Sequence, residues 1–181
     1  MAAKVTLTSR LRRMNDYFSL PFNKYLVIGK KTAWTDDNNP PDPIGNETTI
    51  VEIIGAKKVQ ETWFVKVISN PTEAQKVSAI YYKGLYYSKY ATYAEGVAAG
   101  CTSIIHRAIL DAEDFPIETY RQVGVQVSVD STIPTFRNNE VGPLWSSLPD
   151  NKKGYLEVID NRKPQTRSAD QQEDLIVLVD F

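Results

Sequence analysis

Cysteine and histidine are nearly absent from this sequence of 181 residues, which contains one of each. The single cysteine, Cys101, cannot form an intramolecular disulfide, and a zinc site built on Cys and His side chains lacks ligands. The single histidine, His106, lies in an apolar run, where a packed or hydrogen-bonded role is commoner than that of a general base. A small hydrolase with Cys101 as nucleophile and His106 as base is therefore the least favoured of three functional hypotheses.

The sequence also lacks a charge excess and long apolar runs. Its 21 Lys and Arg residues nearly balance 22 Asp and Glu residues, which gives a formal net charge of −1. Such a balance creates no field that would gather nucleic acid or anionic lipid. No segment approaches the roughly 18 to 20 apolar residues of a membrane-spanning helix, and the N-terminus lacks a secretion signal. We therefore expect protein partners, with no nucleic acid and no membrane.

Motifs for catalysis and cofactor binding are missing as well. The sequence contains no Gly-x-Ser-x-Gly elbow, no phosphate-binding Gly-rich loop and no His-Glu-x-x-His helix. The acids Asp36, Asp37 and Asp42 do not have the spacing of an EF-hand calcium loop. Glu113 and Asp114 are adjacent in a turn, where solvent screening opposes a functional difference between two carboxyl groups. We therefore predict no enzymatic activity, no metal and no cofactor.

Runs of branched and aromatic residues predict a mainly β fold with a few short helices (α+β), organised as a β-sandwich-like single domain with long Pro-rich loops. Residues 120–129 alternate apolar and polar as a half-buried strand does. Residues 175–179 are all aliphatic, which predicts a strand covered on both faces. Lys83-Gly84 predicts the turn of a hairpin. The other strands are expected at 24–29, 63–68, 79–82, 85–87 and 103–110.

Helix signals are few. A Thr8-Ser9 cap precedes apolar residues at helical spacing and predicts an N-terminal helix. Residues 93–99 suit a short helix ended by Gly100. Residues 46–49 resemble a helix start, with three isoleucines facing inward as far as Gly55, and a strand is the alternative. We predict one structural domain over residues 1–181: N-terminal helix at about 8–20, β-rich body at 24–129, long connection at 130–152 and C-terminal strand at 173–181, with a polar hinge at 160–164.

Together with the N-terminal helix, two long irregular segments are the candidate contact surfaces. Residues 31–46 include three prolines, which remove backbone donors and exclude both a helix and a central strand. Trp34 is expected to pin this loop to the body of the protein. The connection 130–152 carries Trp145 and Leu144 as its large apolar anchors. Long loops within compact domains usually have a function or lie against a partner.

Four segments occur together in an order that resembles a known family. They are Thr8-Ser9-Arg10-Leu11, the stretch 26–34 leading to Asn39-Pro40-Pro41-Asp42-Pro43, the segment 115–124, and above all the ending 154–177. In these segments, about half of the chain, the sequence resembles a shortened version of the baseplate-wedge protein family of contractile-tailed bacteriophages, the T-even gene-product-eight type.

The resemblance implies a β-sandwich-like structural protein of the virion, located in the phage tail baseplate and synthesised in the host cytoplasm. It implies a wedge subunit that joins other baseplate or tail proteins, without enzymatic activity or cofactor. The T-even protein is dimeric, and the shortened centre of this chain leaves a homodimer open. A neck or tail-connector structural protein is an alternative.

The leading hypothesis is therefore a baseplate wedge subunit that connects its neighbours by shape-based protein–protein contacts. Partners anchor on aromatic side chains, on Arg and on rigid loops, which lose little entropy on binding. For Arg162, an ion pair with Asp160 or Glu173 is an equal alternative. The protein-interface candidates are Trp34, Asp36, Asp37, Pro40, Pro41, Trp145 and Arg162.

The second hypothesis is a receptor-binding or carbohydrate-binding tail module. Four tyrosines flank the predicted hairpin turn and could form a platform on which sugars stack. The same pattern is typical of a sheet face, and we favour sheet packing for these residues. They are Tyr81, Tyr82, Tyr86 and Tyr87.

Overall fold

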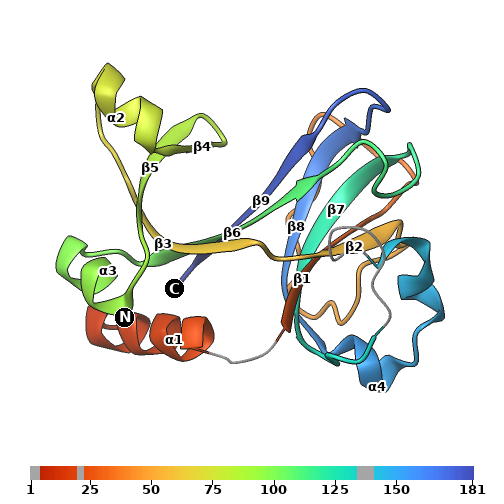
Figure 1. The fold of residues 1–181 in the computed structure, drawn as a ribbon, viewed down its shortest axis with the longest axis horizontal. Coiled ribbons are helices and arrows are strands. Elements are labelled where there is room, and N and C mark those ends of the chain that lie inside the picture. Colours follow the sequence, from red (N-terminus) through yellow and green to blue (C-terminus); the bar gives the residue numbers. More distant parts are fainter. Residues whose placement is uncertain (1–4, 20–22, 134–140) are drawn as a thin grey trace. The chain divides into compact units, whose positions relative to one another are not determined.

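The fold is mainly β, as predicted. The computed structural model describes residues 5–19, 23–133 and 141–181. Its strands form a four-stranded sheet of order β2-β1-β7-β8 and a five-stranded sheet of order β4-β5-β3-β6-β9, accompanied by short helices (Figure 1). The described chain divides into two compact units: 61–106 and 178–181 with the N-terminal segment in the first, and 23–60 with 107–177 in the second. The single-domain organisation stays a prediction.

The second unit is built on the four-stranded sheet. Its strands are β2 (Gly55–Lys58), β1 (Asn23–Gly29), β7 (Thr119–Val129) and β8 (Tyr155–Thr166). Each neighbouring pair is antiparallel, so Val27 lies opposite Ala56 on one side and Gly124 on the other. The predicted strands 24–29 and 120–129 are thereby confirmed.

A core cluster covers one face of this sheet. Trp145 lies in a 3-10 helix, η2 (Gly142–Ser147), and its ring centroid is 5.7 Å from that of Tyr25. The backbone N–H of Val141 donates to the Ala56 carbonyl at 2.9 Å, which ties the segment before η2 to β2. Trp145 is only 1% exposed, so this residue is a core anchor and its indole offers no surface to a partner. The cluster comprises Tyr25, Val27, Ile50, Ala56, Val129, Ile133, Val141 and Trp145.

The long connection is less irregular than predicted. Besides η2, it contains the short helix α4 (Asp150–Lys153), and residues 134–140 lie outside the described part of the chain. Both helical segments were missed in the sequence because they contain or follow Pro and Asn residues, which are typical of loops.

The predicted polar hinge at 160–164 is wrong, because these residues belong to β8. This strand lies at the edge of its sheet, where a proline is tolerated because its missing N–H would face outward. The pairing is also irregular here: Gln122 lies opposite Asn161, and Tyr120 lies opposite Gln165. Pro164 thus occupies a break in the ladder, which removes the conflict between proline and strand.

Two predictions for the centre of the sequence also need correction. Residues 46–54 form neither the predicted helix nor the alternative strand, and Gly55 begins β2 instead of ending a helix. β-Branched isoleucines are poor helix formers, although Ile50 and Ile54 are buried as expected. β7 is buried on both faces instead of one, because its polar residues Gln122 and Gln126 are also covered.

The first unit contains three helices and the hairpin. The predicted strands at 63–68 and 103–110 and the hairpin are confirmed, and α3 ends at Gly100, which has the left-handed φ of 72° that favours glycine. The elements are α1 (Leu7–Ser19), β3 (Glu61–Val67), α2 (Glu73–Ser78), β4 (Ile80–Tyr82), β5 (Leu85–Tyr90), α3 (Tyr93–Ala99) and the first half of β6 (Ser103–Leu110).

The helix α2 was not predicted, although its signal is in the sequence. Thr72 caps the helix through a reciprocal capping box with Gln75. The short element is only six residues long, and its apolar residues show no helical period. The capping box was therefore the one usable sign.

The last strand is β9 (Glu173–Asp180), in which Leu175, Ile176 and Val177 are buried. Successive side chains of a strand point to opposite faces, so this stretch is covered on both faces, as predicted. The division between the two units falls inside this strand, after Val177, and inside β6, after His106.

Replacing Trp145 with alanine should lower the free energy of unfolding by about 3–5 kcal/mol, because the change leaves a large cavity in the core cluster. Urea denaturation measures the loss. The matched control is Val77→Ala, since Val77 is 89% exposed and its truncation should leave stability unchanged. An unaltered midpoint for Trp145→Ala would show that η2 does not contribute to this core.

Candidate protein interface

The Pro-rich loop of the second unit is the candidate interface. Residues 30–54 contain neither helix nor strand, as predicted for 31–46. Pro41, Asp42 and Pro43 are exposed, while Trp34 and Pro40 are partly buried. An irregular segment of this length needs side-chain contacts to hold one conformation, and the structure supplies several.

The strongest attachment is a bidentate ion pair between Arg121 of β7 and Asp37. The Nε–Oδ1 distance is 2.8 Å and the Nη2–Oδ2 distance is 2.7 Å, while Nη1 donates to the Lys31 carbonyl. Two parallel N–H···O bonds fix orientation as well as distance. The irregular pairing of β7 with β8 lies at Arg121, and such irregularities redirect side chains.

Asp37 also organises the loop itself. Its Oδ1 accepts a hydrogen bond from the backbone N–H of Trp34 at 2.8 Å. The hydrogen bonds from Arg121 hold the pKa of Asp37 below its ordinary value, and the same contact raises the pKa of Arg121. The carboxylate therefore stays ionised and keeps the loop attached at neutral pH.

Trp34 pins the loop to the edge strand, and its indole Nε1–H donates to the Arg162 carbonyl at 3.0 Å. The ammonium of Lys30 lies 5.1 Å from the centroid of the Trp34 ring. Arg162 is itself engaged within the unit: its Nε is 2.9 Å from Asp160 and its Nη2 donates to the Ile176 carbonyl. The ion pair with Asp160, one of the two predicted alternatives, is therefore formed.

A relay of amide side chains attaches the loop farther along. Gln122 donates through Nε2 to Asn161 Oδ1 at 2.9 Å, and Asn161 donates through Nδ2 to the Pro41 carbonyl at 2.8 Å. The N–H of Val51 donates to Gln122 Oε1 at 3.3 Å. The loop is thus joined to β7 and β8 near its start, its middle and its end.

The structure brings most of the predicted interface residues together. Trp34, Asp37, Pro41 and Arg162 all take part in these attachments, and the exposed Asp36 accepts from the Asn38 N–H at 2.9 Å. Trp145 is the exception, because it lies in the core cluster. Their contact with another protein stays a proposal.

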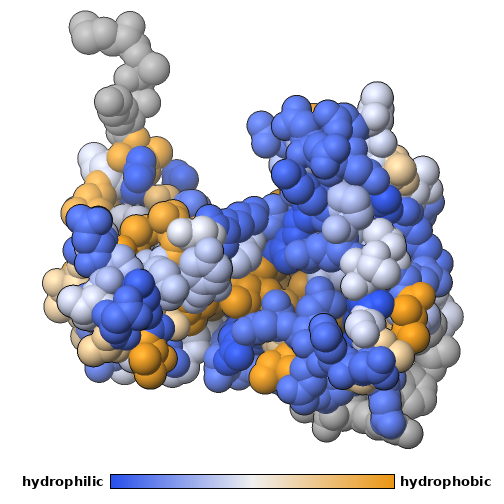
Figure 2. All heavy atoms as spheres, turned by 90° about the horizontal axis from the view of Figure 1, so that it is seen from above, coloured by the Kyte–Doolittle hydropathy of each residue, from blue (hydrophilic) through white to orange (hydrophobic). Residues whose placement is uncertain are grey.

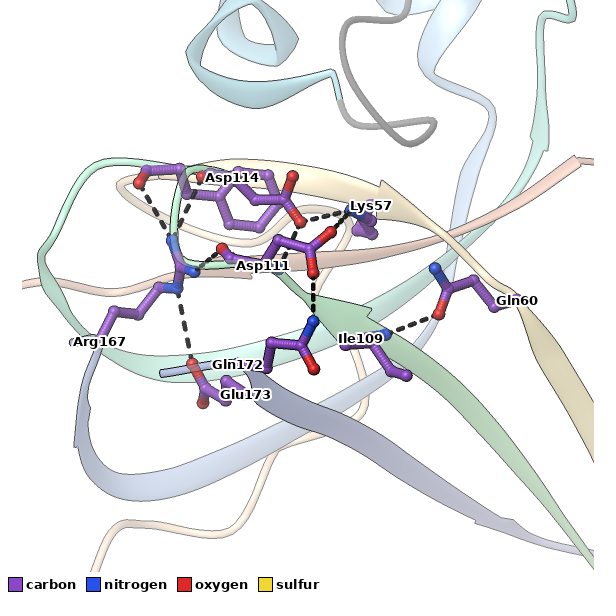
Figure 3. A network of polar contacts seen from close by, with 9 residues as sticks. Lys57, Gln60, Ile109, Asp111, Asp114, Arg167, Gln172 and Glu173 are labelled. Atoms are coloured by element: carbon purple, nitrogen blue, oxygen red, sulfur yellow. Dashed lines mark hydrogen bonds and ion pairs between the residues drawn. The ribbon is translucent and has the colours of Figure 1, made fainter. Parts of the chain in front are cut away.

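A buried network of charges, which sequence reasoning missed, supports the second unit at β2 (Figure 3). Lys57 is fully buried and its Nζ contacts the carboxylate of Asp114, which is 1% exposed. The Asp111 carboxylate lies 3.9 Å from the same Nζ, and the Asp111 N–H donates to Asp114 Oδ2 at 2.7 Å. The prediction of a solvent-screened acidic turn is therefore wrong for Asp114.

Arg167 extends this network at the end of β8. Its Nη1 donates to the carbonyls of Asp114 and Phe115 at 3.2 Å and 3.0 Å, and Nη2 donates to the Asp111 carbonyl at 2.7 Å. Nearby, the Tyr120 hydroxyl donates to Glu173, and burial raises the pKa of Tyr120. The network ties the connection between β6 and β7 to β2 and to the residue that follows β8. No sequence motif predicts this network, because its residues are far apart in the sequence.

His106 and Cys101, the residues of the hydrolase hypothesis, are both buried. His106 is buried, with Nε2 2.8 Å from the Tyr17 hydroxyl and Nδ1 2.9 Å from Thr62 Oγ1. Burial raises the pKa of the Cys101 thiol, which disfavours the nucleophilic thiolate. The packed, hydrogen-bonded interpretation of His106 and the buried apolar one of Cys101 are confirmed.

The four hairpin tyrosines do not form a flat platform. Tyr81 is 59% exposed but Tyr87 is only 5% exposed. The rings of Tyr81 and Tyr86 are 4.9 Å apart and inclined by 50°. Lys83 lies 5.4 Å from the Tyr82 ring. Tyr87 thus serves sheet packing, and the rings of Tyr81 and Tyr86 do not share one plane.

The described residues have a mixed surface, and they form neither a metal-binding cluster nor a membrane-spanning helix. Apolar and hydrophilic side chains are interspersed on the face shown in Figure 2. Within residues 5–19, 23–133 and 141–181, no three His, Cys, Asp or Glu side chains are grouped to hold a metal ion. Within the same ranges, no helix has the length and apolar character to cross a membrane.

Comparison with known proteins finds a matching family and a similar phage protein. The model of a family described as "baseplate wedge 3 tail fiber network component" matches residues 2–181. "Virion protein 3" of Enterococcus phage phiEF24C is 27% identical over 146 residues, a match that covers 81% of this chain and 77% of that protein.

Acid should release the loop from β7. Because the pKa of Asp37 is lowered in the folded state, the attachment is complete above the ordinary value of about 4 and is lost as the pH falls through the lowered pKa. The protection factor of the Trp34 indole N–H, measured by NMR as the free-indole exchange rate at the same pH divided by the observed rate, should fall in this range while amides of β7 stay protected. In Asp37→Asn, exchange should already be fast at neutral pH. A wild-type protection factor that stays constant until β7 itself unfolds would contradict this attachment.

Replacing Lys57 with methionine should lower the free energy of unfolding by about 3–5 kcal/mol, because Asp114 then stays buried without its cation. The double variant Lys57→Met with Asp114→Asn should recover part of the loss, since it removes the uncompensated charge but keeps an acceptor for the Asp111 N–H. Guanidinium denaturation of the wild type, both single variants and the double variant measures the coupling. Strictly additive losses would rule out the ion pair.

Proposed function

Because this chain belongs to the baseplate wedge 3 tail fiber network component family, we propose that it is a structural subunit of the baseplate wedge in a contractile phage tail. The family match extends over nearly the whole chain, and the relative from phage phiEF24C is named as a virion protein. The resemblance to the T-even wedge protein in the segments quoted above supports the same role.

The subunit acts by contact. Its loop at 31–46 docks against neighbouring baseplate or tail proteins, and the observation that carries this proposal is the attachment of the loop by Arg121, Trp34 and Asn161. A loop that is ordered before docking loses little conformational entropy when a partner binds. An exposed segment held by so many side chains is better explained by a partner than by the needs of its own sheet.

The proposal includes no catalytic step. Both ring nitrogens of His106 are hydrogen-bonded and the Cys101 thiol is buried, which supports a structural role for each. The partners are proteins of the baseplate or tail. Size-exclusion chromatography with light scattering would separate a monomer from a homodimer before assembly.

Replacing Asp36–Asp42 by a Gly-Ser linker of equal length, or deleting the segment, should leave a folded chain that no longer enters tails. The measurement is complementation of a phage that lacks the gene, with mass spectrometry of purified particles. Circular dichroism establishes that each variant is folded.

The matched control is Tyr155→Ser, which changes a side chain of the same unit that is 71% exposed. This variant should assemble normally. Normal incorporation of the linker variant would refute a role of the loop in assembly, whatever the deletion does.

A further inference from the structure

One apolar side chain projects from the candidate interface. Ile44 is 79% exposed and is the most exposed large apolar residue in the described part of the second unit. A single exposed isoleucine is common on protein surfaces and by itself indicates nothing. Its backbone, however, is fixed by a hydrogen bond to a side chain of the same loop.

A carboxylate fixes the backbone of Ile44. Glu47 accepts the Ile44 N–H through Oε1 and the Gly45 N–H through Oε2, both at 2.8 Å. These backbone hydrogen bonds keep the pKa of Glu47 below its ordinary value, so the carboxylate stays charged. Gly45 has a left-handed φ of 81°, which this turn requires and which glycine adopts without strain. The turn therefore holds one conformation without contacts from the Ile44 side chain.

The residues before the turn are fixed as well. The Pro41 carbonyl accepts from Asn161 of β8, three residues before Ile44. Pro43 has a restricted φ and limits its predecessor to extended conformations. The isoleucine itself is branched at Cβ and has few rotamers. The side chain is thus displayed in a defined direction from a defined place.

We propose that Ile44 is the apolar anchor of the loop and inserts into an apolar socket on a neighbouring baseplate protein. This inference rests on the proposed function and names the residue and the partner chemistry that it requires. Asp42 is exposed two residues before Ile44, and the proposal places a Lys or Arg on the rim of the socket, where it would pair with this carboxylate. The partner surface is therefore apolar at its centre and basic at its edge.

The anchor accounts for features that an idle loop would lack. Insertion of a preordered isoleucine gains burial of its whole side chain at a small entropic cost. The attachments by Asp37 and Asn161 leave the tip uncovered, so they do not compete with docking. Loss of the anchor should weaken binding to the neighbour by about 10- to 100-fold.

The test uses Ile44→Asp in the full chain, with Ile44→Val as the conservative variant. Ile44→Asp should keep the wild-type unfolding temperature, because the replaced side chain has little contact with the protein, and should fail to enter tails in the complementation assay. Ile44→Val should assemble. The control is Val77→Asp, which places the same charge at an apolar residue that is 89% exposed in the first unit, and it should assemble.

Normal incorporation of Ile44→Asp would overturn the inference. If the linker variant of Asp36–Asp42 still fails in that case, the loop keeps its proposed role without this anchor, whereas success of both variants refutes both proposals. Asp42→Lys tests the rim, and it should reduce incorporation, since it places like charges together. If Ile44→Asp abolishes only self-association, measured by light scattering, the socket belongs to a second copy and the proposed partner is wrong.

Discussion

The ion pair between Arg121 and Asp37 is the contact on which the candidate interface depends. Arg121 is 8% exposed near the start of β7, an inner strand that is buried on both faces, whereas Asp37 belongs to a segment without helix or strand. A bidentate pair transmits the rigidity of the first to the second, because it fixes two distances and a plane. The hydrogen bonds of Trp34 and Asn161 hold further parts of the loop against β8. The conformation of the loop backbone is therefore set by side chains of the sheet.

The four-stranded sheet in turn is held by an apolar core and by a network of buried charged groups. On one face, Trp145 and its neighbours form an ordinary apolar core. Near β2, Lys57 and Asp114 are buried as a charged pair, and Arg167 satisfies three carbonyls of the connection between β6 and β7. Such a network adds little stability compared with an apolar core of the same size, but it accepts only one arrangement of the connection. Definition of a single shape is what the proposed role in assembly requires.

Sequence reasoning found what local patterns encode. Strand β6, the hairpin around Lys83-Gly84 and the helix before Gly100 each follow from residues within the element itself. The failures concern tertiary contacts: residues 160–164 are polar, yet β7 recruits them into a strand, and the isoleucines before Gly55 are buried without forming a helix. The loop was identified from its prolines and Trp34. Its attachment by Arg121 and the exposed position of Ile44 depend on contacts that no spacing reveals.

The residues that fasten the loop differ from those that it exposes. Asp37 and the Pro41 carbonyl contact the sheet, and Glu47 closes the turn internally, so the exposed side chains of Asp42 and Ile44 contribute little to folding. Mutations at the tip are therefore free of the stability threshold that constrains the sheet. Under the proposed docking, selection can refit this tip to a changed neighbour one substitution at a time, while the residues that fasten the loop are retained.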